Sequence, residues 1–128
     1  MSKGKIIVPL YITLPRKTKR DKKVSLNLNW YRNVNFHTNN EVKKKFKEIV
    51  KPQLIWTKYA TPYWLCLTIY YSRLSDLDNW DAVITKYFND ALVELWCVPD
   101  DNMNYFIEKH TTVWWVDKQN PRMEIDII

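Results

Sequence analysis

The alternation of apolar and polar residues along the chain predicts strands near both ends and in the middle. Lys5–Thr13 is rich in β-branched and apolar residues and ends close to Pro15, which is typical of a strand. Tyr63–Tyr71 is an almost continuous apolar run of strand length and indicates a central strand covered on both faces. Residues 105–116 and 122–128 predict two further strands that are separated by a polar turn.

A lysine-rich segment in the first half of the chain has the period of an amphipathic helix. Asn39 or Asn40 is a suitable cap, and we expect the helix to continue to about Lys51, where Pro52 helps to end it. Its apolar residues fall on one side, so it would pack on a sheet and show its lysines to solvent. The preceding segment, 25–32, alternates polar and apolar residues, which indicates a short strand or hairpin.

Residues 79–95 predict a second amphipathic helix, whose apolar side chains lie within one half of a helical wheel. Asp78 or Asn79 is the natural cap, and Pro99 marks the exit. The order of elements is strand, helix, strand, helix, strand, strand. It predicts one α/β (α+β) domain over residues 1–128, in which two main helices pack on one side of a mixed β-sheet.

Charge is distributed unevenly between the two halves of the chain. Residues 1–60 carry fifteen Lys or Arg and three Asp or Glu, whereas residues 61–128 carry five and eleven. The net charges of +12 and −6 suggest that one half holds a polyanion and the other a metal ion. The most basic stretch, 16–23, lacks a regular period and is expected to be a loop or arm. Either it is merely solvated, or its basic residues bind DNA phosphates: Arg16, Lys17, Lys19, Arg20, Lys22 and Lys23.

Cysteines, hydropathy and aromatic residues bear on the compartment and the partners. Cys66 and Cys97 lie in apolar runs and are expected to be buried free thiols in a reducing cytosol. No signal peptide precedes Ile6 and no apolar run reaches membrane-spanning length, so we expect a cytoplasmic protein without a membrane partner.

Seven Trp and eight Tyr exceed the needs of a small core. They indicate either rings that stack on bases, or an aromatic-rich core or dimer interface.

Two acidic clusters flank the second helix: Asp76 and Asp78 before it, and Asp100 and Asp101 after it. Residues i and i+2 of an extended chain point to the same face, so the first pair would aim together. A helix of this length would bring the chain back alongside, and we expect the two clusters to meet at one edge of the sheet. Oxygen ligands without nearby His or Cys favour Mg²⁺ or Mn²⁺, and such a site on a basic chain is typical of nucleases. The alternative is that these residues only cap a helix and form a turn after Pro99.

These residues resemble the RusA-type Holliday junction resolvases, which are small endonucleases of bacteria and phages. The specific part of the resemblance is the acidic motif: Asp76-Leu77-Asp78-Asn79, then Lys86 to Asp90-Ala91-Leu92, then Val98-Pro99-Asp100-Asp101. A looser likeness includes segments 12–15 and 29–32 and the closing pair of strands, so the resemblance spans nearly the whole chain.

The resemblance implies a homodimer that resolves Holliday junctions or other branched DNA by Mg²⁺-dependent phosphodiester hydrolysis, in DNA recombination and repair. Matched position by position, Asp76, Asp78 and Asp101 would be catalytic, metal-binding carboxylates. Asp100 would be a supporting metal ligand.

The chain departs from the family at two positions near the motif. The family's essential lysine follows the second aspartate by one helical turn, where this chain has Ala82. Lys86 lies one turn later and is either the catalytic replacement or a plain solvent-facing lysine. The run of arginines that commonly precedes the motif is reduced to Arg73, which we still expect to contact DNA. These departures support an alternative function, a RusA-like nucleic-acid-binding protein with impaired catalysis.

Overall fold

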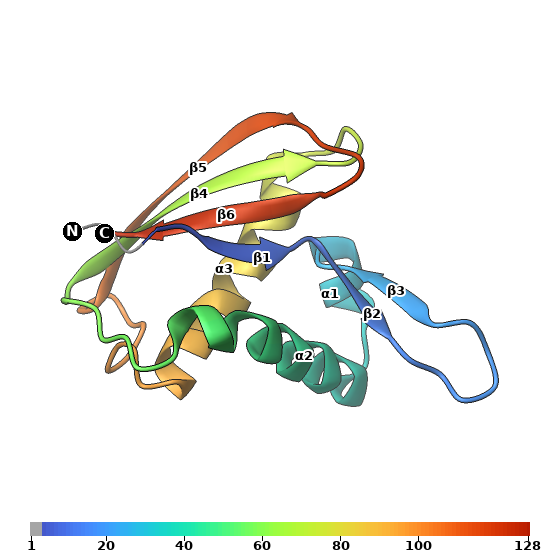
Figure 1. Ribbon diagram of the computed structural model, residues 1–128, viewed down its shortest axis with the longest axis horizontal. Coiled ribbons are helices and arrows are strands. Elements are labelled where there is room, and N and C mark those ends of the chain that lie inside the picture. Colours follow the sequence, from blue (N-terminus) through green and yellow to red (C-terminus); the bar gives the residue numbers. More distant parts are fainter. Residues whose placement is uncertain (1–3) are drawn as a thin grey trace.

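Strands and helices are interspersed along the chain in the computed structural model, which describes residues 4–128. The result is one small α+β domain built from a four-stranded mixed sheet, a separate two-stranded hairpin and helices, and it confirms the predicted class (Figure 1). None of the helices among the described residues is long and apolar enough to cross a membrane. The elements are β1 Ile6–Pro9, β2 Tyr11–Leu14, β3 Lys22–Ser25, α1 Leu28–Asn33, α2 Phe36–Leu54, β4 Tyr63–Tyr71, α3 Leu77–Glu94, β5 Phe106–Val116 and β6 Arg122–Ile127.

The four-stranded sheet has the order β1-β6-β4-β5, so β4 lies inside it. β4 pairs in parallel with β5 and antiparallel with β6, and Leu67 is opposite Thr111 on one side and Ile125 on the other. The last two strands therefore flank β4 and do not pair with each other. Because β4 and β5 are parallel, the chain must cross from one end of the sheet to the other between them, and α3 is that crossover.

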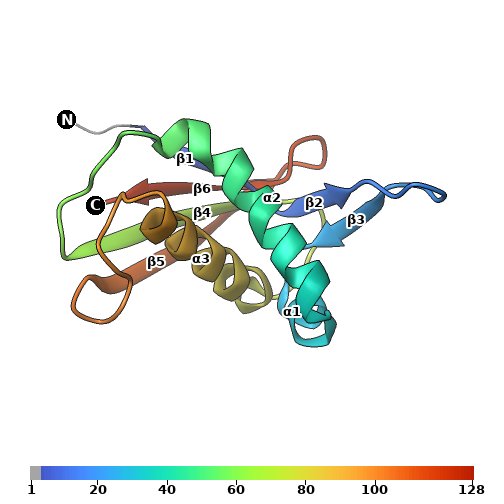
Figure 2. The ribbon, with the colours of Figure 1, turned by 90° about the horizontal axis from the view of Figure 1, so that it is seen from below.

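Helices α2 and α3 cover one face of this sheet (Figure 2). Alternate residues of β4 are buried on that side, and they belong to the same core as the apolar residues of both helices. The other face of β4 is only partly buried, for example at Trp64 and Cys66. The predicted bounds of this strand are confirmed, whereas the expectation that it is covered on both faces is wrong.

The segment predicted as one strand, Lys5–Thr13, is two strands that join different partners. β1 pairs with β6 of the main sheet, and after Leu10 the chain turns away so that β2 pairs with β3. The segment predicted as a strand or hairpin, 25–32, is also different: β3 ends at Ser25 and α1 follows. Asn27 caps α1 by accepting a hydrogen bond from the Trp30 backbone N–H at 3.0 Å.

Helix α2 begins earlier and ends later than its pattern predicted. Its cap is Asn35, whose side chain accepts a hydrogen bond from the Thr38 backbone N–H at 2.8 Å, and not Asn39 or Asn40. Pro52 lies within the last turn instead of ending the helix at Lys51.

The aromatic residues divide between core and surface. Of the seven Trp, only Trp80 belongs to the buried core of the described residues, and four are strongly exposed: Trp56, Trp96, Trp114 and Trp115. The other aromatic rings of the core come from Tyr and Phe, among them Tyr63, Tyr87, Phe46 and Phe88. Both cysteines are free thiols as predicted, with Cys97 buried and Cys66 half-buried.

A buried carboxylate fastens the crossover helix to the edge strand. Asp81 of α3 accepts hydrogen bonds from Lys109 Nζ at 3.0 Å and from Thr111 Oγ1 at 2.7 Å, both on β5. Its side chain is 12% exposed, so the charge is compensated by these partners more than by water.

Replacing this carboxylate should destabilise the fold. We expect Asp81→Ala to lower the free energy of unfolding by about 2 kcal/mol, because Lys109 and Thr111 lose their partner in a partly buried site. Urea denaturation measures the change. Asp21→Ala, in the exposed loop between β2 and β3, should shift the free energy by less than about 0.5 kcal/mol. Equal effects of the two substitutions would contradict the role given to Asp81.

Candidate functional site

The first acidic pair lies at the amino end of α3. Asp76 is the N-cap residue of the helix, although its side chain makes no capping hydrogen bond, and Asp78 is in the first turn. Both side chains are exposed, which leaves their carboxylates available to a ligand. The predicted caps, Asp78 and Asn79, instead lie inside the helix.

A polar hollow of about 530 Å³ opens beside this pair. It is lined by Leu28, Asn29 and Arg32 of α1 and by residues 76–79. Asn79 holds the two helices together here, because its Oδ1 accepts a hydrogen bond from the Leu28 backbone N–H at 3.1 Å. Arg32 thus brings a positive charge to the rim of a hollow that already has two carboxylates. The lining of this hollow by Asn29 and Arg32 was not predicted, because 25–32 was expected to be a short strand or hairpin. Only a helix places these two residues on adjacent turns.

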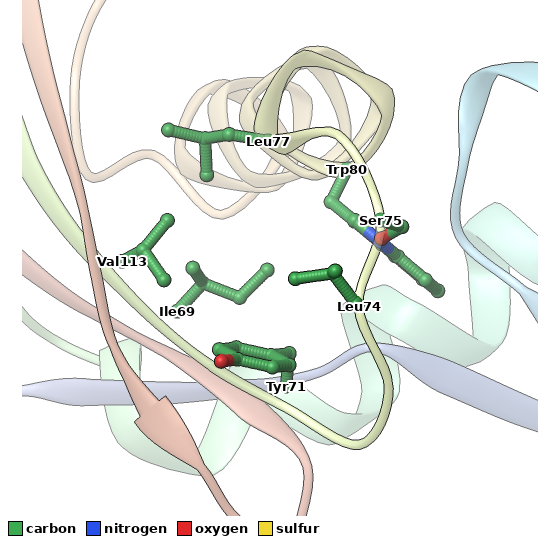
Figure 3. Close-up of a pocket in the computed structure, with 7 residues that line it drawn as sticks. All are labelled: Ile69, Tyr71, Leu74, Ser75, Leu77, Trp80 and Val113. Atoms are coloured by element: carbon green, nitrogen blue, oxygen red, sulfur yellow. The ribbon is translucent and has the colours of Figure 1, made fainter.

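An apolar pocket of about 120 Å³ lies under the loop that leads into α3 (Figure 3). The side chains of Ile69, Leu74 and Leu77 point toward one another across it. Trp80 fixes the loop by donating a hydrogen bond from Nε1 to Ser75 Oγ at 2.6 Å. Leu77 is thereby turned inward while its two acidic neighbours stay exposed. Arg73, in the same loop, is also exposed.

The second acidic pair lies near the carboxyl end of α3, in the loop before β5. Asp100 Oδ1 accepts a hydrogen bond from the Asp101 backbone N–H at 2.7 Å, and its Oδ2 accepts one from Asn102 Nδ2 at 3.0 Å. This carboxylate is therefore engaged in a local turn. Asp101 is half-buried, and burial together with the negative charge of Asp90 raises the pKa of its carboxyl group. Burial, together with the negative charges of Asp101 and Asp100, raises the pKa of Tyr63, whose hydroxyl donates to Asn89 Oδ1 at 2.7 Å.

The two acidic pairs do not meet within one chain. Asp101 is close enough to Asp90 to feel its charge, and Asp90 lies twelve residues beyond Asp78, about 18 Å along the helix axis. The expectation that the clusters share one edge of the sheet is wrong, because a parallel crossover carries the chain to the opposite end before β5 begins. Within residues 4–128, no three or more His, Cys, Asp or Glu residues form a group able to hold a metal ion. The set Asp76, Asp78 and Asp101 does not fit Mg²⁺ in a single chain.

Lys86 belongs to an ion-pair network between α2 and α3. Its Nζ lies 3.6 Å from Asp90 Oδ2, which is also 2.8 Å from Lys43 Nζ. Burial alone would lower the pKa of Lys43, but the hydrogen bond and charge of Asp90, with Glu94 nearby, outweigh burial and raise it. Lys86 is exposed and lies two turns from the first acidic pair, so its partner in this structure is Asp90.

The predicted basic arm is the outer part of the β2–β3 hairpin, which projects from the body of the domain (Figures 1 and 2). All residues of 16–23 are exposed. Arg16 Nε donates to the Arg20 carbonyl at 2.7 Å, which braces the loop, and Lys23 lies 4.2 Å from the ring centre of Tyr11. Lys22 and Lys23 belong to β3, so the arm is partly a strand and not only a loop.

No protein-family model matches this chain, and no curated protein matches it.

The raised pKa of Asp101 predicts a gain in stability on removing its charge. Since the folded-state pKa is above the unfolded value of about 3.9, ionisation disfavours folding, and the full cost is present above the folded pKa. We expect Asp101→Asn to increase the free energy of unfolding at pH 7, with the gain disappearing as the pH falls below 4 or so. Thermal and urea unfolding across this pH range measure it.

Asp78→Asn is the matched control, because it removes an exposed carboxylate that interacts favourably with the amino end of α3. It should lower stability slightly at pH 7. Loss of stability in Asp101→Asn at pH 7 would contradict the destabilisation assigned to the charge of Asp101 by its burial and by Asp90.

Proposed function

We propose that this protein binds nucleic acid through its hairpin arm, with branched DNA as the substrate. The observation that carries the proposal is the projecting hairpin with six exposed basic residues between 16 and 23 and one acidic residue, Asp21. A strongly positive projection suits the phosphate backbone, because each contact releases condensed counterions. The exposed lysines of α2 extend the positive surface from the base of the arm along the domain.

We further propose that the protein hydrolyses this DNA at a composite site between two protomers. The resemblance to RusA-type resolvases implies a homodimer and a Mg²⁺ site that includes Asp76, Asp78 and Asp101. One chain separates the two acidic pairs by most of the length of α3, so a complete site requires the second pair from a partner. Two features support a cation: the exposed carboxylates beside the polar hollow, and the burial and nearby negative charge of Asp90 that disfavour the ionised carboxylate of Asp101.

The second candidate is a nucleic-acid-binding protein without catalysis. It is favoured by the separation of the acidic pairs and by the ion pair that engages Lys86 with Asp90. Both candidates share the arm, and only the first requires the carboxylates to act together.

Mixing two inactive variants tests the composite site. We expect wild-type protein with Mg²⁺ or Mn²⁺ to nick a labelled four-way junction, and Asp78→Asn and Asp101→Asn each to lose this activity. After the two variants are unfolded together and refolded, about a quarter of the wild-type sites should be intact, because half of the dimers are mixed and each has one complete site.

Absence of restored nicking in the mixture would contradict a site shared between protomers. A wild-type protein that binds the junction but never cuts it would instead support the non-catalytic candidate. Asp21→Asn, which removes an exposed carboxylate of the arm, is the control and should keep full nicking activity.

The arm should account for most of the salt dependence of DNA binding. If six phosphate contacts are made, affinity for the junction should fall about a thousandfold between 50 and 200 mM salt, by the relation between contacts and counterion release. Removing one basic residue, as in Lys19→Gln, should reduce the slope of log affinity against log salt by about one. Lys118→Gln, in the exposed turn before β6, should leave the slope unchanged. Equal slopes for wild type and Lys19→Gln would remove the arm from the proposed interface.

A further inference from the structure

Two tryptophans lie almost fully in solvent at equivalent positions, each just after the end of one of the two long helices. Trp56 follows Ile55, the C-cap of α2, and Trp96 follows Leu95, the C-cap of α3. Their exposed fractions are 93% and 81%. Such exposure is unusual for the largest apolar side chain, and here it occurs twice in one small region.

Both tryptophans also have a left-handed backbone conformation, with φ of 63° at Trp56 and 62° at Trp96. The residue after a helix C-cap commonly has this conformation and is then usually glycine, because a Cβ atom crowds the neighbouring carbonyl oxygen. Placing tryptophan there costs stability in the backbone and leaves apolar surface in water. Backbone outliers of this kind point to a role for the side chain beyond folding.

The two rings line a common hollow of about 550 Å³ between the helix ends, together with Ile55 and Leu95. The loops that carry them are fastened to each other. The Tyr59 backbone N–H donates to the Cys97 carbonyl at 2.9 Å, and the buried Cys97 thiol lies 3.6 Å from the Leu54 carbonyl. The backbone segments that carry the two rings are therefore held next to each other, which reduces the entropy lost when a ligand binds between them.

The rim of this hollow is positively charged. Lys51 and Lys58 line it and are exposed, so their ammonium groups are available to an anion. The one acidic lining residue, Glu94, is already paired with Lys47 at 3.0 Å and with Lys43 at 4.0 Å. Flat aromatic surface beside free lysines is complementary to an aromatic ligand with anionic groups at its edge.

We propose that Trp56 and Trp96 form a site for the unpaired nucleotides of single-stranded DNA, with bases stacked on the indoles and phosphates near Lys51 and Lys58. The site rests on the proposed nucleic-acid binding for its ligand class, but it is remote from the arm. α2 runs from the hairpin side of the domain to this hollow (Figure 2). Its exposed Lys44 and Lys51 are about two helical turns apart and lie on one face of the helix. The arm would then bind a duplex part of branched DNA, and the two tryptophans would bind unpaired nucleotides of the same molecule.

Binding of a fluorescein-labelled oligo-dT about eight nucleotides long, followed by anisotropy, tests the site. Trp56→Ala and Trp96→Ala should each weaken affinity about tenfold, which is typical of losing one stacked base. Trp114→Ala, which removes another exposed tryptophan (64%) that lies on β5, should change affinity less than twofold or so. An abasic oligonucleotide of the same length should bind wild type and the double variant Trp56→Ala/Trp96→Ala equally weakly.

A glycine variant separates binding from folding. Trp96→Gly relieves the left-handed backbone, so it should melt at a higher temperature than wild type and still bind oligo-dT as weakly as Trp96→Ala. A merely structural role for Trp96 would make the glycine variant less stable, which overturns the proposal.

Three other results would also overturn it. Unchanged oligo-dT affinity in both alanine variants would exclude stacking and favour a protein partner. An abasic oligonucleotide that binds wild type as tightly as oligo-dT would reduce the site to phosphate contacts. A dimer that dissociates on substitution of both tryptophans would identify the surface as a contact between copies. In each case, retained affinity for the four-way junction leaves the proposed DNA binding by the arm unaffected. A wild-type protein that binds neither the four-way junction nor oligo-dT refutes both the arm-based proposal and the tryptophan site.

Discussion

The parallel pairing of β4 with β5 determines how the rest of the domain is arranged. Two adjacent strands that point the same way require a connection as long as the strands themselves, and α3 provides it. α3 in turn supplies much of the core and is fastened to β5 through Asp81, to α2 through Lys43 and to α1 through Asn79. Both acidic pairs and Trp96 lie at or near the two ends of this helix.

This arrangement gives the domain three distinct polar surfaces. The amino end of α3 presents Asp76 and Asp78 beside a hollow. The other end presents Asp101 near Asp90, and Trp96 follows the C-cap of the helix there. The hairpin arm is independent of α3, because β2 and β3 form a sheet of their own. A role in handling branched DNA would use these surfaces together, and no single one of them accounts for such a role.

Elements that follow from local pattern were predictable from sequence, and elements that depend on pairing were not. The continuous apolar run of β4 gave its bounds at both ends, and the period of α3 located that helix to within two residues. The division of the first predicted strand into β1 and β2 at Leu10 was not predicted. The two halves have the same kind of local sequence pattern and differ only in the strands with which they pair. The acidic clusters were misplaced for a related reason: the direction of β5 relative to β4 depends on pairing, and the parallel arrangement starts β5 at the end of the sheet opposite to Asp76 and Asp78. Trp96 did have a local signal, since it directly follows the predicted helix 79–95 at a position where glycine is usual. Trp56 had none, because α2 was expected to end at Lys51 and in fact continues to Leu54.

The separation of the acidic pairs within each chain is the central claim, and a distance measurement tests it most directly. Spin labels at Asp78→Cys and Asp101→Cys, in a chain with Cys66 and Cys97 replaced by serine and diluted with unlabelled protein, can be measured by pulsed electron paramagnetic resonance. The parallel crossover predicts a distance of about 18 Å or more, the rise of α3 between Asp78 and Asp90. A distance of about 10 Å or less would mean that one chain can gather both pairs around one ion, and it would contradict the account.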